Sequence, residues 1–273
     1  MEPLIFHIDV NSAYLSWTST ENVRTGTGPD LRLLPAIIGG DQKNRHGVVL
    51  AKSIPAKAFG IVTGEPVATA FKKCPTLQMA APDHHLYHAY SQRLMTLLES
   101  FCPYLEQLSI DECFLDMGRR GYRREHAQAL AEEIRAEVRK LGFTVNVGIS
   151  SRKVLAKMAS DFQKPDKTHT LFPEEIKEKM WPLPVGELYM AGHSSVTTLH
   201  MLGILTIGDL ARSDRSLIES HLKSHGTLLW EYANGIDDRP VITEEPEAKG
   251  IGNSTTLPHD VTSRAEAKST LLT

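Results

Sequence analysis

Three acidic side chains in two apolar settings are the residues best suited to chemistry. Asp9 lies at the end of an apolar run in LIFHIDVNSAYLSW, and Asp111 and Glu112 are adjacent in YLEQLSIDECFLDM. A carboxylate beside a buried strand is costly unless a cation or a hydrogen-bond donor is near, because loss of water destabilises the ionised form. Carboxylates that converge from both segments would therefore call for a metal ion.

Both segments look like strands that end near the acidic residues. Residues 4–10 are a short apolar run followed by Asn11 and Ser12, and residues 105–115 are two strand-like pieces that meet at the sequence SIDE. Carboxylates at the strand ends of one sheet can point at one place, and their hard oxygens suit Mg²⁺. Two such ions would form the clamp used for in-line displacement at phosphorus.

A purely structural explanation is also open at this point. Asp9 would cap the helix that follows it, and Asp111 with Glu112 would occupy a polar hairpin turn. The spacing of the three residues does not choose between the two explanations.

Composition limits the class of protein. A chain of 273 residues that is 41% hydrophobic can bury more than one core, so two or three domains are expected. A net charge of −3 and a pI near 6.5 exclude a uniformly basic nucleic-acid binder. Any DNA contact would come from local clusters, such as the arginines within 119–124 or Lys153 and Lys157. A solvated helix face is the alternative for each cluster.

Cysteine usage and hydropathy indicate the compartment. Cys74, Cys102 and Cys113 are odd in number and lack CxxC spacing, which predicts free thiols that act as small buried hydrophobes in a reducing environment. The sequence has no run of 18 apolar residues, and it opens into a strand without a secretory leader. We therefore expect a soluble, cytoplasmic protein without a membrane segment.

The order of the predicted elements indicates an α+β fold. Strands are expected at 4–10, 35–39, 47–52, 105–109, 112–116 and 144–149, and helices at 12–22, 65–74, 84–101, 123–140 and 152–163. This order matches a split βαβ, ferredoxin-like sheet with an insertion after the first strand. Short helices follow from 173 to about 235, and residues 237–249 have the composition of a linker.

Taken together, the motifs resemble those of the Y-family of translesion DNA polymerases, also called the UmuC/ImpB/MucB/SamB family, and most closely its DNA polymerase IV or DinB-like branch. The resemblance runs from about residue 4 to residue 210. It rests on HIDVNSAYLSW, VLAKSIPAKAFGIVTGEP, SIDECFLDM, VNVGISSRKVLAKMASDFQKP and LGILTIGDL. Several ordered motifs of this length are far more specific than one short pattern.

The resemblance implies an enzyme that transfers a nucleotide from a dNTP to a primer 3′-hydroxyl opposite a template, with low fidelity, during tolerance of DNA damage. It implies two Mg²⁺ ions held by Asp9, Asp111 and Glu112, with the backbone carbonyl of Val10 as a further ligand. Glu112 would lie nearest the attacking oxygen.

The resemblance also implies a nucleotide site. Tyr14 matches the steric gate, a ring that leaves no room for a ribose 2′-hydroxyl. Lys57 and Lys164 match the cations that hold the triphosphate, although the family more often has arginine at the first position. Ser53 would be a small residue near the nucleotide.

Primer–template DNA is the partner that the resemblance implies. Gly192 and Ser194 fall in the position of a helix-hairpin-helix that offers N–H groups to phosphates, and Lys153 would add charge. One hairpin glycine of the family is replaced here by Met190. The resemblance further implies a sliding clamp as partner of a full-length form.

The expected domains are a palm (1–12 and 80–171), fingers (13–79), a helical thumb (172–238), a linker (239–249) and the start of an incomplete little finger (250–273). The chain is therefore expected to be a truncated polymerase. Two alternatives stay open from the residues: a non-catalytic DNA- or partner-binding remnant, and a palm-fold nucleotide cyclase.

Overall fold

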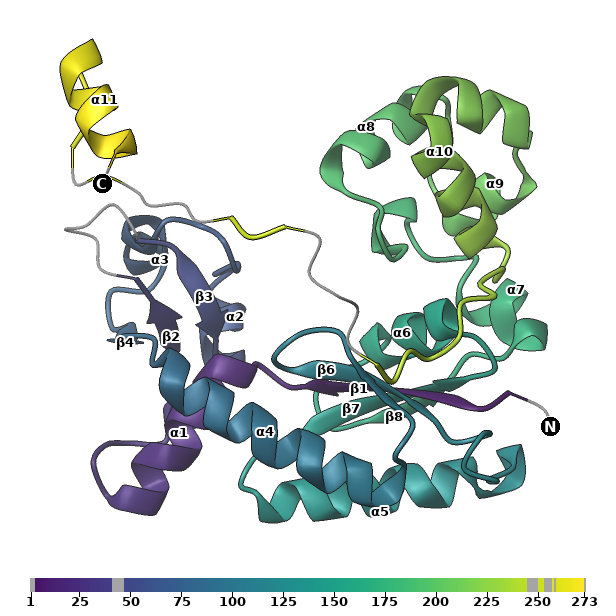
Figure 1. Ribbon diagram of the computed structural model, residues 1–273, viewed down its shortest axis with the longest axis horizontal. Helices are drawn as coiled ribbons and strands as arrows, with labels where there is room; N and C mark the ends of the chain where they lie inside the picture. The colour runs from purple at the N-terminus through teal and green to yellow at the C-terminus, as the bar shows by residue number, and fades with distance from the viewer. Residues whose placement is uncertain (1–2, 41–46, 245–249, 253–256, 258, 273) are drawn as a thin grey trace. The chain divides into compact units, whose positions relative to one another are not determined.

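The structure is a computed structural model that describes residues 3–40, 47–244, 250–252, 257 and 259–272. The chain divides into two compact units, one of residues 1–20 and 84–245 and the other of residues 21–83 and 246–273. Strands and helices are mixed in both units, so the predicted α+β class is confirmed (Figure 1).

The first unit is built on a sheet of five strands in the order β5-β6-β1-β7-β8. These strands are β1 (Ile5–Val10), β5 (Leu105–Gln107), β6 (Glu112–Asp116), β7 (Val145–Ser150) and β8 (Thr168–Thr170). The central strand β1 runs antiparallel to both β6 and β7, and β8 runs parallel to β7. The split βαβ arrangement that the element order predicts is therefore present, with β8 as an additional edge strand.

Helices cover both faces of this sheet (Figure 1). Helices α4 (His84–Phe101) and α5 (Ala127–Lys140) lie on one face, and α6 (Lys153–Asp161) lies on the other. Because side chains alternate along a strand, Phe6 and Ile8 enter the core under α4 and α5, whereas His7 and Asp9 point towards α6. The polar residues of β1 are thus gathered on one face.

A tight turn joins β1 to α1 (Ala13–Thr25). Ser12 has a left-handed φ of 49°, so the helix begins only three residues after the strand. Trp17 of this helix is fully buried in the core beside Tyr87 of α4. The start of α1 is therefore firmly attached to the sheet that carries Asp9.

The rest of the first unit is helical, as predicted for residues 173–235. It contains 3₁₀ turns at Pro173–Glu175 and Val185–Glu187, and helices α7 (Ile176–Lys179), α8 (His193–Met201), α9 (Ile207–Arg212) and α10 (Arg215–Ala233); a further 3₁₀ turn, Arg124–His126, precedes α5. Their core includes Val154, Leu155 and Met158 of α6. Helix α6 is therefore packed on both sides, against the sheet and against this helical part.

The second unit contains a sheet of three strands in the order β3-β2-β4. Its elements are β2 (Ala36–Gly39), β3 (Val49–Lys52), β4 (Gln78–Ala80), a 3₁₀ turn (Leu31–Leu33), α2 (Ile54–Ala58), α3 (Val67–Lys73) and α11 (Arg264–Leu271). The sequence did not predict β4, α2 or, in the first unit, β8. Each has only three to five residues, too few for a hydrophobic period to be visible.

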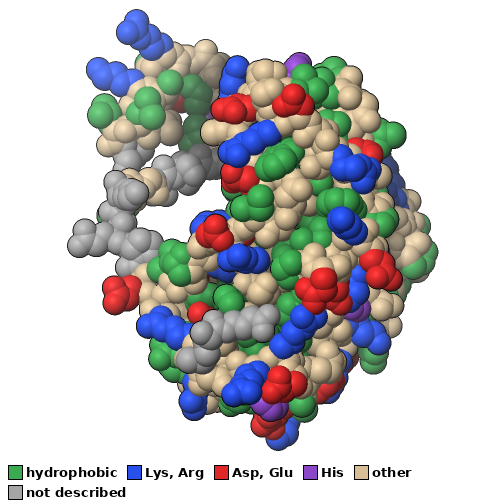
Figure 2. Space-filling view, turned by 90° about the vertical axis from the view of Figure 1, so that its right-hand side faces the viewer, with side chains coloured by type: hydrophobic (Ala, Val, Ile, Leu, Met, Phe, Trp, Pro, Cys, Tyr) green, Lys and Arg blue, Asp and Glu red, His purple; other side chains and the backbone are tan. Residues whose placement is uncertain are grey.

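All three cysteines are free and buried, as expected. Among the described residues, no helix is both long and apolar enough to cross a lipid bilayer. Positive and negative side chains are interspersed over the face drawn in Figure 2. Part of the predicted linker, residues 245–249, and part of the predicted start of the little finger, residues 253–256, 258 and 273, lie outside the described residues.

Candidate active site

Strand pairing brings two of the predicted carboxylates together. Asp9, near the end of β1, lies directly opposite Glu112, the first residue of β6. The Val10 N–H donates to the carbonyl of Asp111 at 3.0 Å, which holds the loop before β6 against the end of β1. Opposite residues on antiparallel strands have neighbouring side chains, so this register places both carboxylates at one end of the sheet.

Asp111 lies beside this pair. Its Oδ1 accepts a 2.7 Å hydrogen bond from Ser109 Oγ. Burial raises the pKa of Asp111, and the charges of Asp9 and Glu112 raise it further. Within the described part of the chain, the acidic and imidazole groups whose ligand atoms all come within 4.8 Å of one another are His7, Asp9 and Glu112. Asp111 is thus electrostatically coupled to the cluster but stands at its edge.

Two lysines neutralise the carboxylates. Lys157 of α6 contacts Glu112 Oε2, and its Nζ lies 3.7 Å from Asp9 Oδ2. Lys164, just after α6, places its Nζ 3.1 Å from Asp9 Oδ2 and 2.9 Å from Asp161 Oδ1. The Lys157 side chain is only 12% exposed, whereas that of Lys164 is 37% exposed. The buried ammonium group is therefore the main counter-charge of the site.

The local electrostatics keep Glu112 ionised. Burial alone would raise its pKa, but contacts with His7 and Lys157 outweigh burial and lower the pKa of Glu112 to about 2. For Lys157 and Lys164 burial alone would lower the pKa, yet the nearby carboxylates raise the pKa of both. Anionic oxygens and ammonium groups therefore coexist in a largely dehydrated site.

Glu112 is expected to make the metal-free protein sensitive to acid. Its carboxyl pKa is about 2 in the fold against an ordinary value of 4.5, so its stabilising contribution is present above pH 4.5 and is lost as the pH falls towards 2. This contribution corresponds to roughly 3 kcal/mol in the free energy of unfolding. Urea unfolding in EDTA from pH 7 to pH 2.5 should show a smaller acid loss for Glu112→Gln than for the wild type. Equal acid losses would contradict the assignment.

Sequence reasoning missed His7. Its side chain is fully buried, with Nδ1 2.8 Å from Ser160 Oγ and Nε2 3.2 Å from Glu112 Oε2. Burial lowers the pKa of His7, although the contact with Glu112 opposes this effect. The sequence did carry one indication of His7. It lies two residues before Asp9, so in a strand the two side chains lie on the same face.

Tyr14 lies in the first turn of α1. Its ring stacks on Tyr87 of α4 with centroids 4.3 Å apart and planes 11° apart. The edge of His84 meets the same ring, with centroids 6.0 Å apart. These contacts make the partly buried Tyr14 ring a rigid wall rather than a freely rotating side chain.

Two predicted nucleotide residues belong to the second unit. Ser53 is buried and caps α2: its Oγ accepts from Ala56 N–H at 3.1 Å and donates to the Leu34 carbonyl at 2.6 Å. Lys57 is an exposed residue of the same short helix. A structural role is thus visible for Ser53, and nucleotide binding by either residue stays a prediction.

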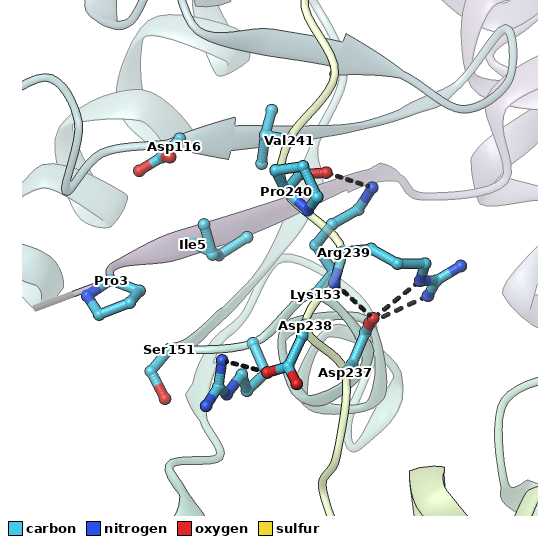
Figure 3. A pocket seen from close by; sticks show the side chains of 11 residues that line it. Pro3, Ile5, Asp116, Ser151, Lys153, Asp237, Asp238, Arg239, Pro240 and Val241 are labelled. Atoms are coloured by element: carbon cyan, nitrogen blue, oxygen red, sulfur yellow. Dashed lines mark hydrogen bonds and ion pairs between the residues drawn. The ribbon is translucent and has the colours of Figure 1, made fainter. Parts of the chain in front are cut away.

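Lys153, predicted to bind DNA, is almost completely buried. Its Nζ lies 2.7 and 2.6 Å from the two Glu106 carboxylate oxygens and 3.2 Å from the Pro240 carbonyl. Lys153 and residues 237–241 line a pocket of about 180 Å³, and Figure 3 shows the Lys153 side chain beside Pro240. The ammonium group thus attaches the segment that follows α10 to the sheet, and DNA binding by Lys153 stays a prediction.

The predicted hairpin lies before α8. Gly192 is the N-cap of α8, and both Gly192 and Ser194 are exposed. Met190, which stands where the family has a glycine, adopts a left-handed φ of 72°. The turn is therefore formed without the glycine, although a side chain there carries a conformational cost.

The first unit is thus a ferredoxin-like sheet that carries neighbouring carboxylates at one strand end, with lysines beside them. Comparisons with known proteins show the family to which the chain belongs. The model of the impB/mucB/samB family matches residues 8–161. The chain is 50% identical to DNA polymerase IV of Clostridium acetobutylicum, covering 100% of this chain and 69% of the relative, and 37% identical to that of Acetivibrio thermocellus, covering 98% and 66%.

Solved structures show the same fold. A crystal structure of DinB from Sulfolobus solfataricus superimposes with a TM-score of 0.75 at 24% identity, covering 87% of this chain and 69% of that one. A ternary complex of Dbh gives a TM-score of 0.74 at 24% identity, covering 86% and 68%. The chain belongs to the impB/mucB/samB family, that is, to the Y-family of translesion DNA polymerases. It spans about two thirds of the length of the curated relatives it matches.

Proposed function

We propose that this chain transfers a nucleotide from a dNTP to a primer 3′-hydroxyl on template DNA with two Mg²⁺ ions, as part of low-fidelity translesion synthesis. The observation that carries the proposal is the register of Asp9 opposite Glu112, with Asp111 beside them. Carboxylate oxygens are the hard ligands that Mg²⁺ prefers, so the donor set fits these ions. The Val10 carbonyl would be a further ligand.

The residues of the chain have distinct tasks in this reaction. Asp9, Asp111 and Glu112 would hold the ions, and Glu112 would lie nearest the attacking primer oxygen. Bound Mg²⁺ would lower the pKa of the 3′-hydroxyl and neutralise charge on the triphosphate. Lys164 is the more exposed lysine beside Asp9, so its ammonium group would bind the triphosphate, and the family resemblance implies the same task for Lys57.

The remaining assignments follow the family. Gly192 and Ser194 at the start of α8, and Lys153, would contribute to binding of primer–template DNA. The palm would comprise residues 1–12 and 80–171, the fingers 13–79, the thumb 172–238, the linker 239–249 and the start of the little finger 250–273. We also propose a cytoplasmic location, because DNA and dNTPs are the proposed substrates. A longer form of the protein would have a sliding clamp as a further partner.

Tyr14→Ala is expected to admit ribonucleotides. The Tyr14 ring is held by its stack on Tyr87, and removing it opens the space that the ring occupies. Selection against one extra hydroxyl by a steric clash is lost when the clashing group is removed. Incorporation of rNTP relative to dNTP should rise by at least about tenfold, which corresponds to about 1.4 kcal/mol of discrimination. Val23→Ala, an exposed change farther along α1, is the control; an unchanged ratio for Tyr14→Ala would remove it from the gate role.

The activity is tested by single-nucleotide incorporation with enzyme in excess over primer–template, because this format does not require repeated rebinding. We expect extension with dNTP and Mg²⁺ on undamaged and abasic templates, and none after EDTA. A folded protein that leaves the primer unextended in Mg²⁺ on both templates would contradict the proposal.

A further inference from the structure

A buried polar assembly lies beneath the carboxylates and is not explained by metal ligation alone. His7 lies between Ser160 of α6 and Glu112 of β6, and its ring is tilted on Phe114 with centroids 4.9 Å apart. The imidazole is fully buried. A buried ring with two polar nitrogens is costly unless both nitrogens find partners, so its presence calls for a specific role.

The neighbours of His7 indicate which ring nitrogen carries the proton. An ionised carboxylate only accepts hydrogen bonds, so the contact of Nε2 with Glu112 Oε2, 3.2 Å away, is favourable in the tautomer that carries its proton on Nε2, although the ring is not aligned for a regular hydrogen bond to this oxygen. In the neutral ring Nδ1 then accepts, and Ser160 Oγ at 2.8 Å is its donor. The same hydroxyl can instead donate to the Lys157 carbonyl at 2.7 Å, but that carbonyl is inside α6, where the helix supplies a backbone donor, so the hydroxyl can turn to Nδ1 without leaving the carbonyl unpaired.

Glu112 is therefore held from two sides by groups of different character. Lys157 is a cation on a long, flexible side chain, whereas His7 is a short, fully buried ring. A divalent ion held by Asp9 and Glu112 would repel an ammonium group near the same oxygens, so Lys157 would be displaced from them. A neutral imidazole is not repelled and can keep its contact.

We propose that His7, fixed by Ser160, is a positioning residue that keeps the Glu112 carboxylate oriented when Lys157 gives way to a divalent ion. The inference rests on the proposed function, because it assumes that Glu112 is a metal ligand. Groups that hold a metal ligand in place typically contribute 10- to 100-fold to metal affinity. His7 would therefore influence metal binding without touching the metal.

The test compares His7→Asn with His7→Gln. The amide nitrogen of glutamine reaches about as far as Nε2 and can still donate to Glu112, whereas the shorter asparagine reaches only to the level of Nδ1. Mn²⁺ binding to the DNA-free protein, followed by the electron paramagnetic resonance signal of free Mn²⁺, should weaken by about 10- to 100-fold in His7→Asn. His7→Gln should restore most of the affinity. Ser160→Ala, which removes only the hydroxyl that fixes the ring, should weaken binding to a smaller extent.

The outcomes separate this inference from the proposed function. Equal Mn²⁺ affinities for the wild type, His7→Asn and Ser160→Ala, in proteins with cooperative thermal unfolding, would overturn the role of His7. If His7→Asn does not fold, the Mn²⁺ affinity of Ser160→Ala alone tests the role of His7, and an affinity equal to that of the wild type would overturn it. Wild-type Mn²⁺ binding that Asp9→Asn does not weaken would overturn the metal site itself and this inference with it. A wild type that binds Mn²⁺ at the site but extends no primer would contradict only the proposed function.

Discussion

Asp9→Asn is expected to lower single-nucleotide incorporation by at least about 10²- to 10³-fold, the usual effect of removing one group that stabilises developing charge. Asparagine keeps the shape of aspartate but removes the negative charge that faces Glu112 across the strand pair. The fold should survive, because the Lys157 ammonium group keeps its contact with Glu112. Single-turnover primer extension at saturating dNTP measures the loss, and thermal unfolding checks the fold.

Asp116→Asn is the matched control for this experiment. Asp116 is the last residue of β6, the strand that begins with Glu112. It lies opposite Ile5, at the other end of the β1–β6 pair. It accepts a hydrogen bond from the Arg119 N–H at 2.8 Å and is not part of the carboxylate cluster. Incorporation by Asp116→Asn should stay within about threefold of the wild type, less than 1 kcal/mol in the barrier. Equal activity of Asp9→Asn and Asp116→Asn would contradict the assignment of the site.

Gly148→Ala is expected to have the largest effect on stability. A Cβ at this position of β7 would lie 2.0 Å from the Ala156 carbonyl oxygen and 2.5 Å from the Ser160 nitrogen, both in the backbone of α6. Backbone atoms inside a helix that is packed on both sides cannot give way locally, so the whole helix must shift. We expect the free energy of unfolding to fall by about 3 kcal/mol or more, measured by urea denaturation.

Gly186→Ala provides the comparison for Gly148→Ala. A Cβ at Gly186 would meet only two methyl groups of Val196, at 3.6 and 3.8 Å, which are ordinary contacts. Its unfolding free energy should change by less than about 1 kcal/mol. Because α6 carries Ser160, which fixes His7, Gly148→Ala should also weaken Mn²⁺ binding. A Gly148→Ala protein as stable as Gly186→Ala would show that α6 does not approach β7 this closely.

Some features of the site could be predicted because their signals are local. Apolar runs that end at Asp9 and at SIDE indicate strands with carboxylates at their ends, since strand formation and burial follow short-range patterns. The separation of Tyr14 from Asp9 in the sequence could be interpreted in the same way, because it depends only on where one strand ends and the next helix begins. The helix expected at 123–140 is Ala127–Lys140 after a 3₁₀ turn, an ordinary error of boundary.

Other features depend on contacts that leave no local pattern. Lys157 looked like one member of a surface cluster, yet it is the buried counter-charge of Glu112, 45 residues away in the chain. The pairing of the Lys153 charge with Glu106 was not visible in the sequence either. Both lysines lie on α6, and the charge pattern of a helix does not reveal that two of its faces will be covered.

The sequence by itself thus determined the α+β class, the family and the placement of acidic residues at strand ends, because periodicity and contiguous motifs encode these properties directly. Only the tertiary structure decided which groups meet: the register that sets Asp9 against Glu112, the burial of His7 between Glu112 and Ser160, and the closeness of α6 to β7 at Gly148. These are long-range contacts, and their geometry follows from the packing of whole elements rather than from any short stretch of residues.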